Sequence, residues 1–258
     1  SSALVGTDIR VTTDDGSPVE LAREIVSASS TAQTGELHFK ANSISSTTDT
    51  VFRIYYNGTT TQSYVSSEEY GAQNVWTNDY VAVWHMEETG VLDSTSNSNN
   101  GSDSGSLSIS SGKTGAGVDF AGGFITVPNS PALQVIGDLT LSYWGNRDSS
   151  SLRMNPIYKT YGGEYTITEE TNRTSNFYWG TAGSDTSPYS TLTNPATPAL
   201  NEWYHAVFTR NNSSQTAASY SDGSLSSEST AGAIGGSPGG WRTPVSSAAD
   251  VLIGDGYV

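Results

Sequence analysis

The sequence contains no cysteine, few basic residues and no long apolar run. The absence of cysteine excludes a disulfide framework, a thiolate metal site and a thiol nucleophile. Only 11 lysines and arginines stand against 26 acidic residues, and the net charge of −15 would repel phosphate backbones and anionic bilayers. No apolar stretch approaches the roughly 18 to 20 residues that a membrane span needs. We therefore predict no nucleic-acid partner and no direct membrane insertion.

The residues that are abundant indicate short strands joined by polar turns. The 258-residue chain has 27 glycines, 14 tyrosines and 6 tryptophans, and only 34% of its residues are hydrophobic. Such a composition favours many short strands over long amphipathic helices. The length is sufficient for one large β domain or for two smaller ones. We therefore predict an all-β protein.

The first part of the chain predicts a small antiparallel sheet. Alternating or apolar runs, separated by turn-rich stretches, lie at residues 8–12, 36–40 and 51–56. Residues 20–26 fit one helical turn or a strand equally well. The polar residues 57–67 offer little to bury. We predict a small β domain over residues 1–71 and a linker over residues 72–79.

From residue 80 onward the pattern predicts a second, larger β domain, at residues 80–258. Turn residues separate aromatic-rich runs at residues 81–86, 117–120, 124–127, 139–144, 155–159, 165–168, 176–179, 203–210 and 217–221. Each such strand can bury one face and needs a second sheet to cover it, which indicates an antiparallel β-sandwich. Asp222 and Gly223 are predicted to form a hairpin turn. The low-complexity residues 94–111 and 231–240 are predicted surface loops.

Several stretches of the second domain resemble one known family. Residues 115–130 (GAGVDFAGGFITVPNS) precede residues 138–144 (DLTLSYW), and residues 202–210 (EWYHAVFTR) precede residues 220–223 (YSDG). In this order and spacing they resemble the laminin-G-like, concanavalin A-type sandwich family. Residues 83–88 (VWHMEE), followed by residues 93–101 (DSTSNSNNG), are similar to the entry strand and first loop of its bacterial members. The resemblance covers residues 80–258 and implies a concanavalin A-like antiparallel sandwich.

The first domain and the chain ends carry a shorter likeness. Residues 8–12 (DIRVT) and 50–56 (TVFRIYY) resemble a small β domain of unknown function that often precedes such sandwiches in microbial surface proteins. The family sandwich usually continues past residues 252–254, and the small domain usually has an aromatic-rich strand before residue 8. We therefore expect the first domain to be incomplete at its N-terminal side and the second at its C-terminal side. A protein neighbour, or the remainder of the parent chain, is then expected to cover the open sheet edge.

The sequence lacks the carboxylate pattern of the hydrolases that share this sandwich. Laminarinase-like members place two Glu and an Asp at alternating positions of one strand, and no such Glu-x-Asp-x-Glu run is present. Glu169 and Glu170 are expected to point to opposite faces of an extended segment, whereas retaining hydrolysis needs carboxyl groups about 5 to 5.5 Å apart. No Gly-x-Ser-x-Gly elbow supports a serine nucleophile. We predict that the protein is not an enzyme; glycoside hydrolysis is the third alternative.

The three histidines show no metal-binding spacing. His38, His85 and His205 lie in predicted strands among aromatic and aliphatic residues. Their order alone does not exclude a catalytic set with a serine and an aspartate. For His85 and His205 the favoured interpretation is a strand residue that is hydrogen-bonded within the sandwich.

One loop, at residues 93–103, is rich in the hard oxygen donors that calcium prefers. Many members of the superfamily hold one calcium at the rim of the sandwich, so the resemblance implies calcium as a cofactor. The predicted ligands are Asp93, Asn97, Asn100 and Asp119. The same residue types also populate ordinary loops, because they tolerate left-handed turns and bond their own backbone. Asp119 fits a solvated strand residue as well as a ligand of a rim ion.

Exposed aromatic rings are the expected ligand-binding groups. A carbohydrate-binding surface stacks aromatic faces on sugar C–H groups and fixes the hydroxyls with Asn, Asp and Gln side chains. In the family, the concave sheet and its rim loops hold the ligand. The predicted ligand-binding residues are Tyr158, Tyr161, Trp179 and Trp241. The alternative is that half of the rings fill the core, because apolar strands contain Trp144, Trp179 and Trp203.

Two interpretations of function follow. The first is a non-catalytic carbohydrate-binding, lectin-like or adhesion module of a secreted, cell-surface or virion protein, with a glycan or cell-surface polysaccharide as its partner. The second is a structural spacer or subunit-contact module in a larger surface assembly. Binding of a glycan, with or without calcium, separates the first from the second.

Overall fold

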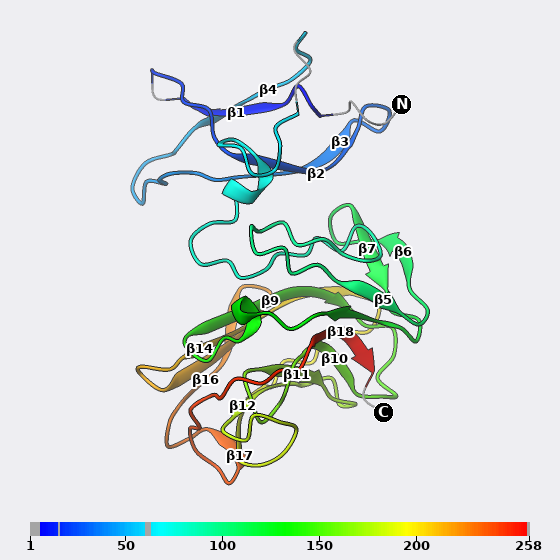
Figure 1. Ribbon diagram of the computed structural model, residues 1–258, viewed down its shortest axis with the longest axis vertical. Coiled ribbons are helices and arrows are strands. Elements are labelled where there is room, and N and C mark those ends of the chain that lie inside the picture. The colour runs from blue at the N-terminus through cyan, green and yellow to red at the C-terminus, as the bar shows by residue number, and fades with distance from the viewer. Residues whose placement is uncertain (1–5, 15, 60–62, 257–258) are drawn as a thin grey trace. The chain divides into compact units, whose positions relative to one another are not determined.

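The computed structural model describes residues 6–14, 16–59 and 63–256. The chain divides into two compact units, each with its own sheets (Figure 1). The first unit lies in residues 1–100 and 109–118, and the second lies in residues 101–108 and 119–258. The domain limits predicted from the sequence stay a prediction.

The first unit contains two antiparallel strand pairs. These are β1 (Arg10–Thr13) with β4 (Phe52–Tyr55), and β2 (Arg23–Ser29) with β3 (Thr34–Phe39). The pairs confirm the predicted small antiparallel strands, and β2 shows that residues 23–26 are strand and not helix. Val11 of β1 and Leu21 are buried, which removes their apolar surface from water and stabilises this unit.

Residues 81–86, which were predicted to form a strand, form no strand in the structure. Their backbone groups bond to side chains of the loop that follows instead of to a neighbouring strand. The N–H of Val83 donates to Asp93 Oδ1 at 3.0 Å. The carbonyl of Val81 accepts from Asn97 Nδ2, also at 3.0 Å. Asx side chains thus satisfy backbone groups that a strand partner would otherwise satisfy.

The second unit is a sandwich of two antiparallel sheets (Figure 1). The strands of the larger sheet are β5 (Ser102–Ser104), β8 (Phe124–Val127), β10 (Met154–Tyr158), β11 (Thr166–Glu169), β12 (Ser175–Gly180), β13 (Tyr189–Asn194), β17 (Gly235–Ser237) and β18 (Val251–Gly256). Those of the smaller sheet are β9 (Leu139–Asn146), β14 (Trp203–Asn211), β15 (Thr216–Ser221) and β16 (Ser224–Thr230). The larger sheet has the order β17-β13-β12-β11-β10-β18-β8-β5, and the smaller has the order β16-β15-β14-β9. The architecture confirms the predicted all-β, concanavalin A-like sandwich.

Alternating side chains hold the two sheets together. Along β14 every second residue is buried, among them Ala206 and Phe208. Phe208 meets Phe177 of β12 across the interior, with ring centroids 5.8 Å apart. Trp179, also on β12, is fully buried beside Phe177 at a centroid distance of 5.0 Å. A period of two is what a strand with one buried face requires.

Some strands lie outside the runs that the sequence predicts. They are β13, β16 and β18, together with the short β5, β6 (Ser108–Ser111) and β17 in low-complexity segments that were predicted to be loops. Apart from β18, which begins with three apolar residues, these strands are mostly small and polar, so their pairing depends on the neighbouring strands more than on apolar alternation. β16 follows β15 through Asp222 (φ 49°) and Gly223 (φ 78°), which confirms the predicted hairpin turn. A further pair, β6 (Ser108–Ser111) with β7 (Ala116–Asp119), forms a two-stranded sheet.

The helices that the structure describes are single 3-10 turns, η2 (Ala72–Asn74) and η3 (Pro131–Leu133). At the start of η3, Ser130 Oγ accepts a hydrogen bond from the Leu133 N–H at 3.4 Å, as an N-cap side chain does. Among the described residues, no helix combines the length and the apolar character that crossing a membrane requires.

Candidate functional site

The outer face of the eight-stranded sheet carries tyrosines and polar side chains. Along β12 the side chains alternate, so Trp179 is buried inside the sandwich while Asn176 and Tyr178 lie on the opposite face. Tyr178 stands opposite Thr166 of β11 and Thr191 of β13 in the strand ladder. The side chains of these three residues therefore form a row across β11, β12 and β13, on the face of the sheet that points away from the core.

Three tyrosine rings gather on this face. Tyr161 lies 5.3 Å from Tyr189 and 6.2 Å from Tyr178, and Tyr178 lies 5.7 Å from Tyr189, measured between ring centroids. All three pairs meet edge to face, an arrangement that aromatic quadrupoles favour. The rings are half-buried, so each is held by neighbours and still reaches solvent. Burial raises the pKa of the Tyr178 phenol, which therefore stays protonated at neutral pH.

Asp185 joins the two loops that border the tyrosine cluster. Its carboxylate accepts hydrogen bonds from the Tyr158 hydroxyl and, at 3.1 Å, from the backbone N–H of Tyr161. Its own carbonyl accepts from the Tyr161 hydroxyl at 2.7 Å. Asp185 is exposed and lies in the segment between β12 and β13, whereas Tyr161 follows β10. The carboxylate thus places an anionic group directly beside the rings.

A row of polar groups continues from the rings along the same face. Asn176 Nδ2 donates to Glu170 Oε1 at 3.0 Å, and Asn176 Oδ1 accepts from the Thr193 hydroxyl at 2.7 Å. Glu170 Oε2 lies 3.0 Å from Arg153 Nε in an ion pair. These amide, hydroxyl and charged groups can donate to and accept from the hydroxyls of a polar ligand.

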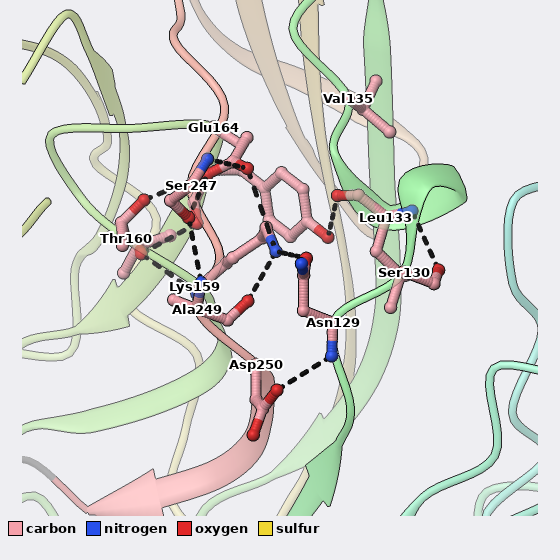
Figure 2. A network of polar contacts seen from close by, with 12 residues as sticks. Asn129, Ser130, Leu133, Val135, Lys159, Thr160, Glu164, Ser247, Ala249 and Asp250 are labelled. Atoms are coloured by element: carbon pink, nitrogen blue, oxygen red, sulfur yellow. Dashed lines mark hydrogen bonds and ion pairs between the residues drawn. The ribbon is translucent and has the colours of Figure 1, made fainter. Parts of the chain in front are cut away.

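A buried polar network fixes the loop that carries Tyr161 (Figure 2). Lys159 and Glu164, on either side of Tyr161, are both fully buried, and Lys159 Nζ lies 3.8 Å from Glu164 Oε1. The ammonium also donates to Asn129 Oδ1 at 2.7 Å and to the Ala249 carbonyl at 2.6 Å. Burial lowers the pKa of Lys159, although the charges of Glu164 and Asp250 oppose that shift.

The Glu164 side chain ties this loop to the segment that precedes β18 (Figure 2). Ser247 donates from its N–H to Oε1 at 2.7 Å and from its hydroxyl to Oε2 at 2.8 Å. The Thr160 hydroxyl donates to Oε2 at 3.1 Å. The buried Arg210 donates to the Glu164 carbonyl, and burial lowers the Arg210 pKa only to about 10, so the guanidinium stays charged at neutral pH. Because each carboxylate oxygen is bonded, the network can hold its charges in the interior.

Gly162 allows the two bordering loops to approach closely. A Cβ atom at this position would lie 2.2 Å from the Thr186 carbonyl oxygen and 2.4 Å from that of Ser184. The Gly162 carbonyl also accepts hydrogen bonds from the N–H groups of Ala182 and Gly183 in the neighbouring loop, at 2.8 and 2.9 Å. Only a residue without a side chain fits this approach, which keeps Tyr161 and Asp185 together.

The four residues predicted to bind the ligand do not form one group. Tyr158 and Tyr161 lie at the tyrosine cluster. Trp179 is a correction, because its ring is 0% exposed and fills the core, where it cannot stack on a ligand. Trp241 packs on Trp179 with centroids 5.0 Å apart and donates its indole N–H to Asn212 Oδ1 at 3.2 Å. Trp144, which the alternative interpretation counted among possible core rings, is 48% exposed on the four-stranded sheet.

Two of the residues predicted to bind calcium, Asp93 and Asn100, accept hydrogen bonds from neighbouring groups. The Asp93 carboxylate accepts from the backbone N–H groups of Val83, Thr95 and Asn99, at 2.9 to 3.0 Å, and from the Thr95 hydroxyl at 2.8 Å. Asn100 Oδ1 accepts from the Asp93 N–H at 2.8 Å. Two carboxylate oxygens offer about four acceptor sites, so Asp93 has little capacity left for an ion. Asp93 and Asn100 thus accept several hydrogen bonds in this structure.

The other two predicted calcium ligands, Asn97 and Asp119, have different surroundings. Asn97 uses its Nδ2 to donate to Val81, and Asp119 ends β7 with an exposed side chain in the second unit. Calcium binding by this chain stays a prediction.

Glu169 and Glu170 point to opposite faces of the eight-stranded sheet, as predicted. Glu169 is buried, and its Oε1 accepts from the Tyr143 hydroxyl at 2.7 Å and from the Tyr204 hydroxyl, both on the four-stranded sheet. Glu170 bonds to Asn176 on the outer face. The two carboxylates are therefore separated by the sheet and cannot act together on one glycosidic bond.

The histidines differ from one another in their surroundings. His205 Nε2 lies 2.9 Å from Ser142 Oγ within the four-stranded sheet, which confirms the predicted hydrogen-bonded strand residue. His85 is hydrogen-bonded to Glu24 but belongs to no strand. Its ring stacks on His38 at a centroid distance of 5.0 Å, so two histidines that the sequence spacing did not connect are neighbours.

A comparison with protein families gives the sandwich a family. The sequence profile of the concanavalin A-like lectin/glucanases superfamily matches residues 119–256, just over half of the 258-residue chain. The chain belongs to this superfamily. The matched residues contain the tyrosine cluster and both sheets of the sandwich except β5. A comparison with curated proteins finds no match.

Solved structures similar to this superfamily member include two sugar-related domains. Domain 4 of AbnA, a GH43 extracellular arabinanase from Geobacillus stearothermophilus in complex with arabinotriose, is 14% identical with a TM-score of 0.48; the alignment covers 64% of this chain and 78% of that one. The CBM40 of the Ruminococcus gnavus IT-sialidase is 10% identical with a TM-score of 0.37, and the alignment covers 47% of this chain and 66% of that one.

The four predicted ligand-binding residues leave out several groups of the candidate site. They are Tyr178, Tyr189, Asp185, Asn176 and Glu170. Strand alternation along residues 175–180 could have separated Tyr178 from Trp179, because neighbouring strand residues face opposite sides. No local signal identifies Asp185 or Tyr189, which reach the cluster through the pairing of β12 with β13.

Proposed function

We propose that the second unit is a non-catalytic carbohydrate-binding module whose ligand lies on the outer face of the eight-stranded sheet. The observation that carries the proposal is the cluster of Tyr161, Tyr178 and Tyr189 beside Asp185 and Asn176. Aromatic faces pack against the C–H groups of sugar rings, while carboxylate and amide groups bond the hydroxyls. Membership of a superfamily named for lectins and glucanases supports a carbohydrate as the ligand.

The buried network also favours a binding role for this face. Lys159 and Glu164 hold both ends of the loop that presents Tyr161, and Asp185 bonds that loop to its neighbour. A site whose side chains are fixed before binding loses less conformational entropy when the ligand arrives. We therefore infer a preformed platform on which a ligand of sugar-ring size can stack.

The test is calorimetric titration of the whole chain with a panel of soluble polysaccharides and oligosaccharides. Tyr161→Ala and Tyr178→Ala should each lower the affinity at least about fivefold, which corresponds to about 1 kcal/mol. Trp144→Ala is the matched control, because this ring is exposed on the other sheet, and it should leave binding unchanged. If Trp144→Ala loses binding and the two tyrosine variants keep it, the ligand binds to the four-stranded sheet instead.

The proposal is for binding without catalysis. Glu169 bonds inside the sandwich and Glu170 pairs with Arg153 on the outer face, so this adjacent pair does not supply an acid and a base to one ligand. Incubation with a bound oligosaccharide should release no reducing ends. If reducing ends are released, and Glu170→Gln abolishes their release, the protein is a hydrolase and not a non-catalytic binding module.

We further propose that the protein is an adhesion module of a secreted, cell-surface or virion protein, because a glycan-binding sandwich meets its ligand at such surfaces. The second candidate is a subunit-contact or spacer module. It is favoured by β9, an edge strand of the four-stranded sheet that carries the exposed Trp144, because edge strands offer backbone groups to another chain. No glycan binding, together with a dimeric mass in solution, would favour this second function.

A further inference from the structure

Two histidines and a glutamate converge on one point in the first unit. Glu36 and His38 are alternate residues of β3, so both side chains lie on one face of that strand. His85 reaches the same point from a segment without regular structure. Glu36 Oε1 lies 2.8 Å from His38 Nε2 and 3.9 Å from His85 Nδ1. One donor atom from each of the three residues lies within 4.8 Å of the other two.

A second glutamate fixes the orientation of His85. Glu24 of β2 stands opposite His38 in the strand ladder, and its Oε2 lies 3.0 Å from His85 Nε2. The same carboxylate accepts from the Ser94 hydroxyl at 2.6 Å and from the indole N–H of Trp76. An ionised carboxylate only accepts hydrogen bonds, so His85 Nε2 carries a proton. In the neutral ring, Nδ1 then presents its lone pair toward Glu36.

A bound cation would stabilise that arrangement. A nitrogen lone pair and a carboxylate oxygen that face each other repel, unless a positive charge lies between them. A histidine whose outer nitrogen donates to a carboxylate is also the usual arrangement of a metal-bound imidazole, because the carboxylate fixes the tautomer and raises the basicity of the ring. We propose that Glu36, His38 and His85 bind one zinc-class divalent cation, with Glu24 as the residue that positions His85.

The distances and the donor types both fit this class of ion. In a tetrahedral zinc site, bonds of 2.0 to 2.1 Å place the ligand atoms about 3.3 Å apart. The 3.9 Å separation of Glu36 Oε1 from His85 Nδ1 is somewhat longer than that value. The 2.8 Å separation from His38 Nε2 is that of the hydrogen bond that the two residues make without an ion, so binding an ion would release the His38 Nε2 proton. Two imidazoles and one carboxylate suit zinc and its neighbours in the first transition row, whereas calcium prefers oxygen ligands throughout. Three protein ligands leave a fourth position for water or for a donor atom of a ligand.

The site is shielded and still accessible. The side chains of Glu36 and His85 are 19% and 15% exposed, and Trp76 packs against the His38 ring at a centroid distance of 5.2 Å. A pocket of about 400 Å³ opens beside it, lined by His38, Trp76 and Tyr80 among others. An ion can therefore enter from solvent, while the rings limit competition from water.

The first experiment is calorimetric titration of the chelator-treated whole chain with Zn²⁺. We expect one saturable site per chain, and an affinity at least tenfold lower in Glu36→Gln, His38→Asn and His85→Asn. His205→Asn is the matched control, because this third histidine lies in the other unit, and it should bind as the unsubstituted protein does. Absence of a saturable site, or equal loss of affinity in the His205 control, would overturn the proposal.

The role of Glu24 needs a readout that a loss of folding would not imitate. Glu24→Gln should weaken Zn²⁺ binding about 10- to 100-fold, whereas the Co²⁺-loaded variant should keep the intense visible absorption of a tetrahedral site. An unchanged Zn²⁺ affinity would show that Glu24 does not position His85. Loss of the Co²⁺ absorption would show that Glu24 is a direct ligand or is needed for the structure of the site.

A measurement on the unsubstituted protein covers the case in which the variants do not fold. Long-range proton–nitrogen NMR spectra of the imidazoles should show that Zn²⁺ shifts the signals of His38 Nε2 and His85 Nδ1, while His205 stays unchanged. The alternative is a metal-free cluster in which a protonated imidazole bridges the carboxylates. In that case Zn²⁺ leaves the His38 and His85 signals in place, and the proposal fails whether or not the second unit binds a glycan.

Discussion

Removing one partner of the buried Lys159–Glu164 pair should strongly destabilise the second unit. Lys159→Met keeps the length of the side chain but leaves the fully buried Glu164 carboxylate without its ammonium. Glu164→Gln keeps the shape but leaves that ammonium with only the oxygens of Asn129 and Ala249 as close acceptors. An uncompensated buried charge costs about 3 to 5 kcal/mol. For a unit of this size we expect the melting temperature to fall by roughly 6 to 20 °C.

The double variant separates charge pairing from simple loss of contacts. With Lys159→Met and Glu164→Gln combined, no unpaired charge remains at this pair, and the remaining cost is that of the lost hydrogen bonds, at about 1 kcal/mol each. The double variant should therefore be more stable than the sum of the two single effects predicts, by about 2 kcal/mol. Urea unfolding followed by tryptophan fluorescence reports on this unit, because Trp179 is fully buried in it.

Two results would refute the reasoning. If either single variant unfolds within about 1 kcal/mol of the unsubstituted protein, the pair is not the anchor that its burial indicates. If the double variant equals the sum of the single variants, the two charges are not coupled. A variant that is fully stable but loses glycan binding would instead show that the network positions Tyr161 without contributing to folding.

Three further predictions concern other parts of the structure. Tyr204→Phe should cost about 1.5 to 3 kcal/mol at neutral pH, because Glu169 loses a hydrogen-bond donor. Burial raises the Tyr204 pKa above its unfolded value of 10.0, so the folded state keeps a proton that the unfolded state loses. The stability of the unsubstituted protein should then fall toward that of the variant by up to about 1.4 kcal/mol per pH unit above pH 10, and parallel urea-unfolding curves would contradict this. Gly162→Ala should destabilise by about 1 to 3 kcal/mol and weaken glycan binding, whereas Gly232→Ala, with no atom within 4 Å of the added Cβ, should stay within about 0.5 kcal/mol in the same unfolding assay. Asp93→Asn should cost about 1 to 3 kcal/mol, because an amide nitrogen cannot accept the hydrogen bonds of this carboxylate; a melting-temperature loss that appears only when calcium is present would show that the loop is an ion site.

The sandwich could be predicted from the sequence because each long strand carries its own pattern. Residues 139–143 (LTLSY) alternate between apolar and polar side chains, and the structure alternates there between partly buried and exposed positions. β16 contains too little alternation to be recognised from its sequence, and β18 has only three apolar residues before Gly254. Their ladder partners place both strands, and the turn at Asp222 and Gly223 also places β16. Residues 81–86 are a mostly apolar run (VAVWHM) that resembles a strand, but they bond to loop side chains, because local Asx bonding competes with strand pairing.

The candidate sites were less predictable because they form across segments. An aromatic run such as residues 177–179 indicates that rings will face both ways, but the second sheet decides that Trp179 is buried and Tyr178 is not. The spacing of Glu36 and His38 was visible as alternate residues of one strand. His85 completes that cluster only through the fold of an irregular segment, which no periodicity describes.

The same short loop connects the interior of the sandwich with its candidate binding face. Lys159 and Glu164 point inward and are held by the segment before β18, while Tyr161 between them points to the outer face. An apolar loop could be buried at lower desolvation cost, since replacing a buried ion pair with well-packed apolar residues is often neutral or stabilising. A charged, fully bonded pair instead restricts the loop to one conformation, because any displacement leaves a buried charge without partners. The position of Tyr161 thus depends on interactions that never contact a ligand.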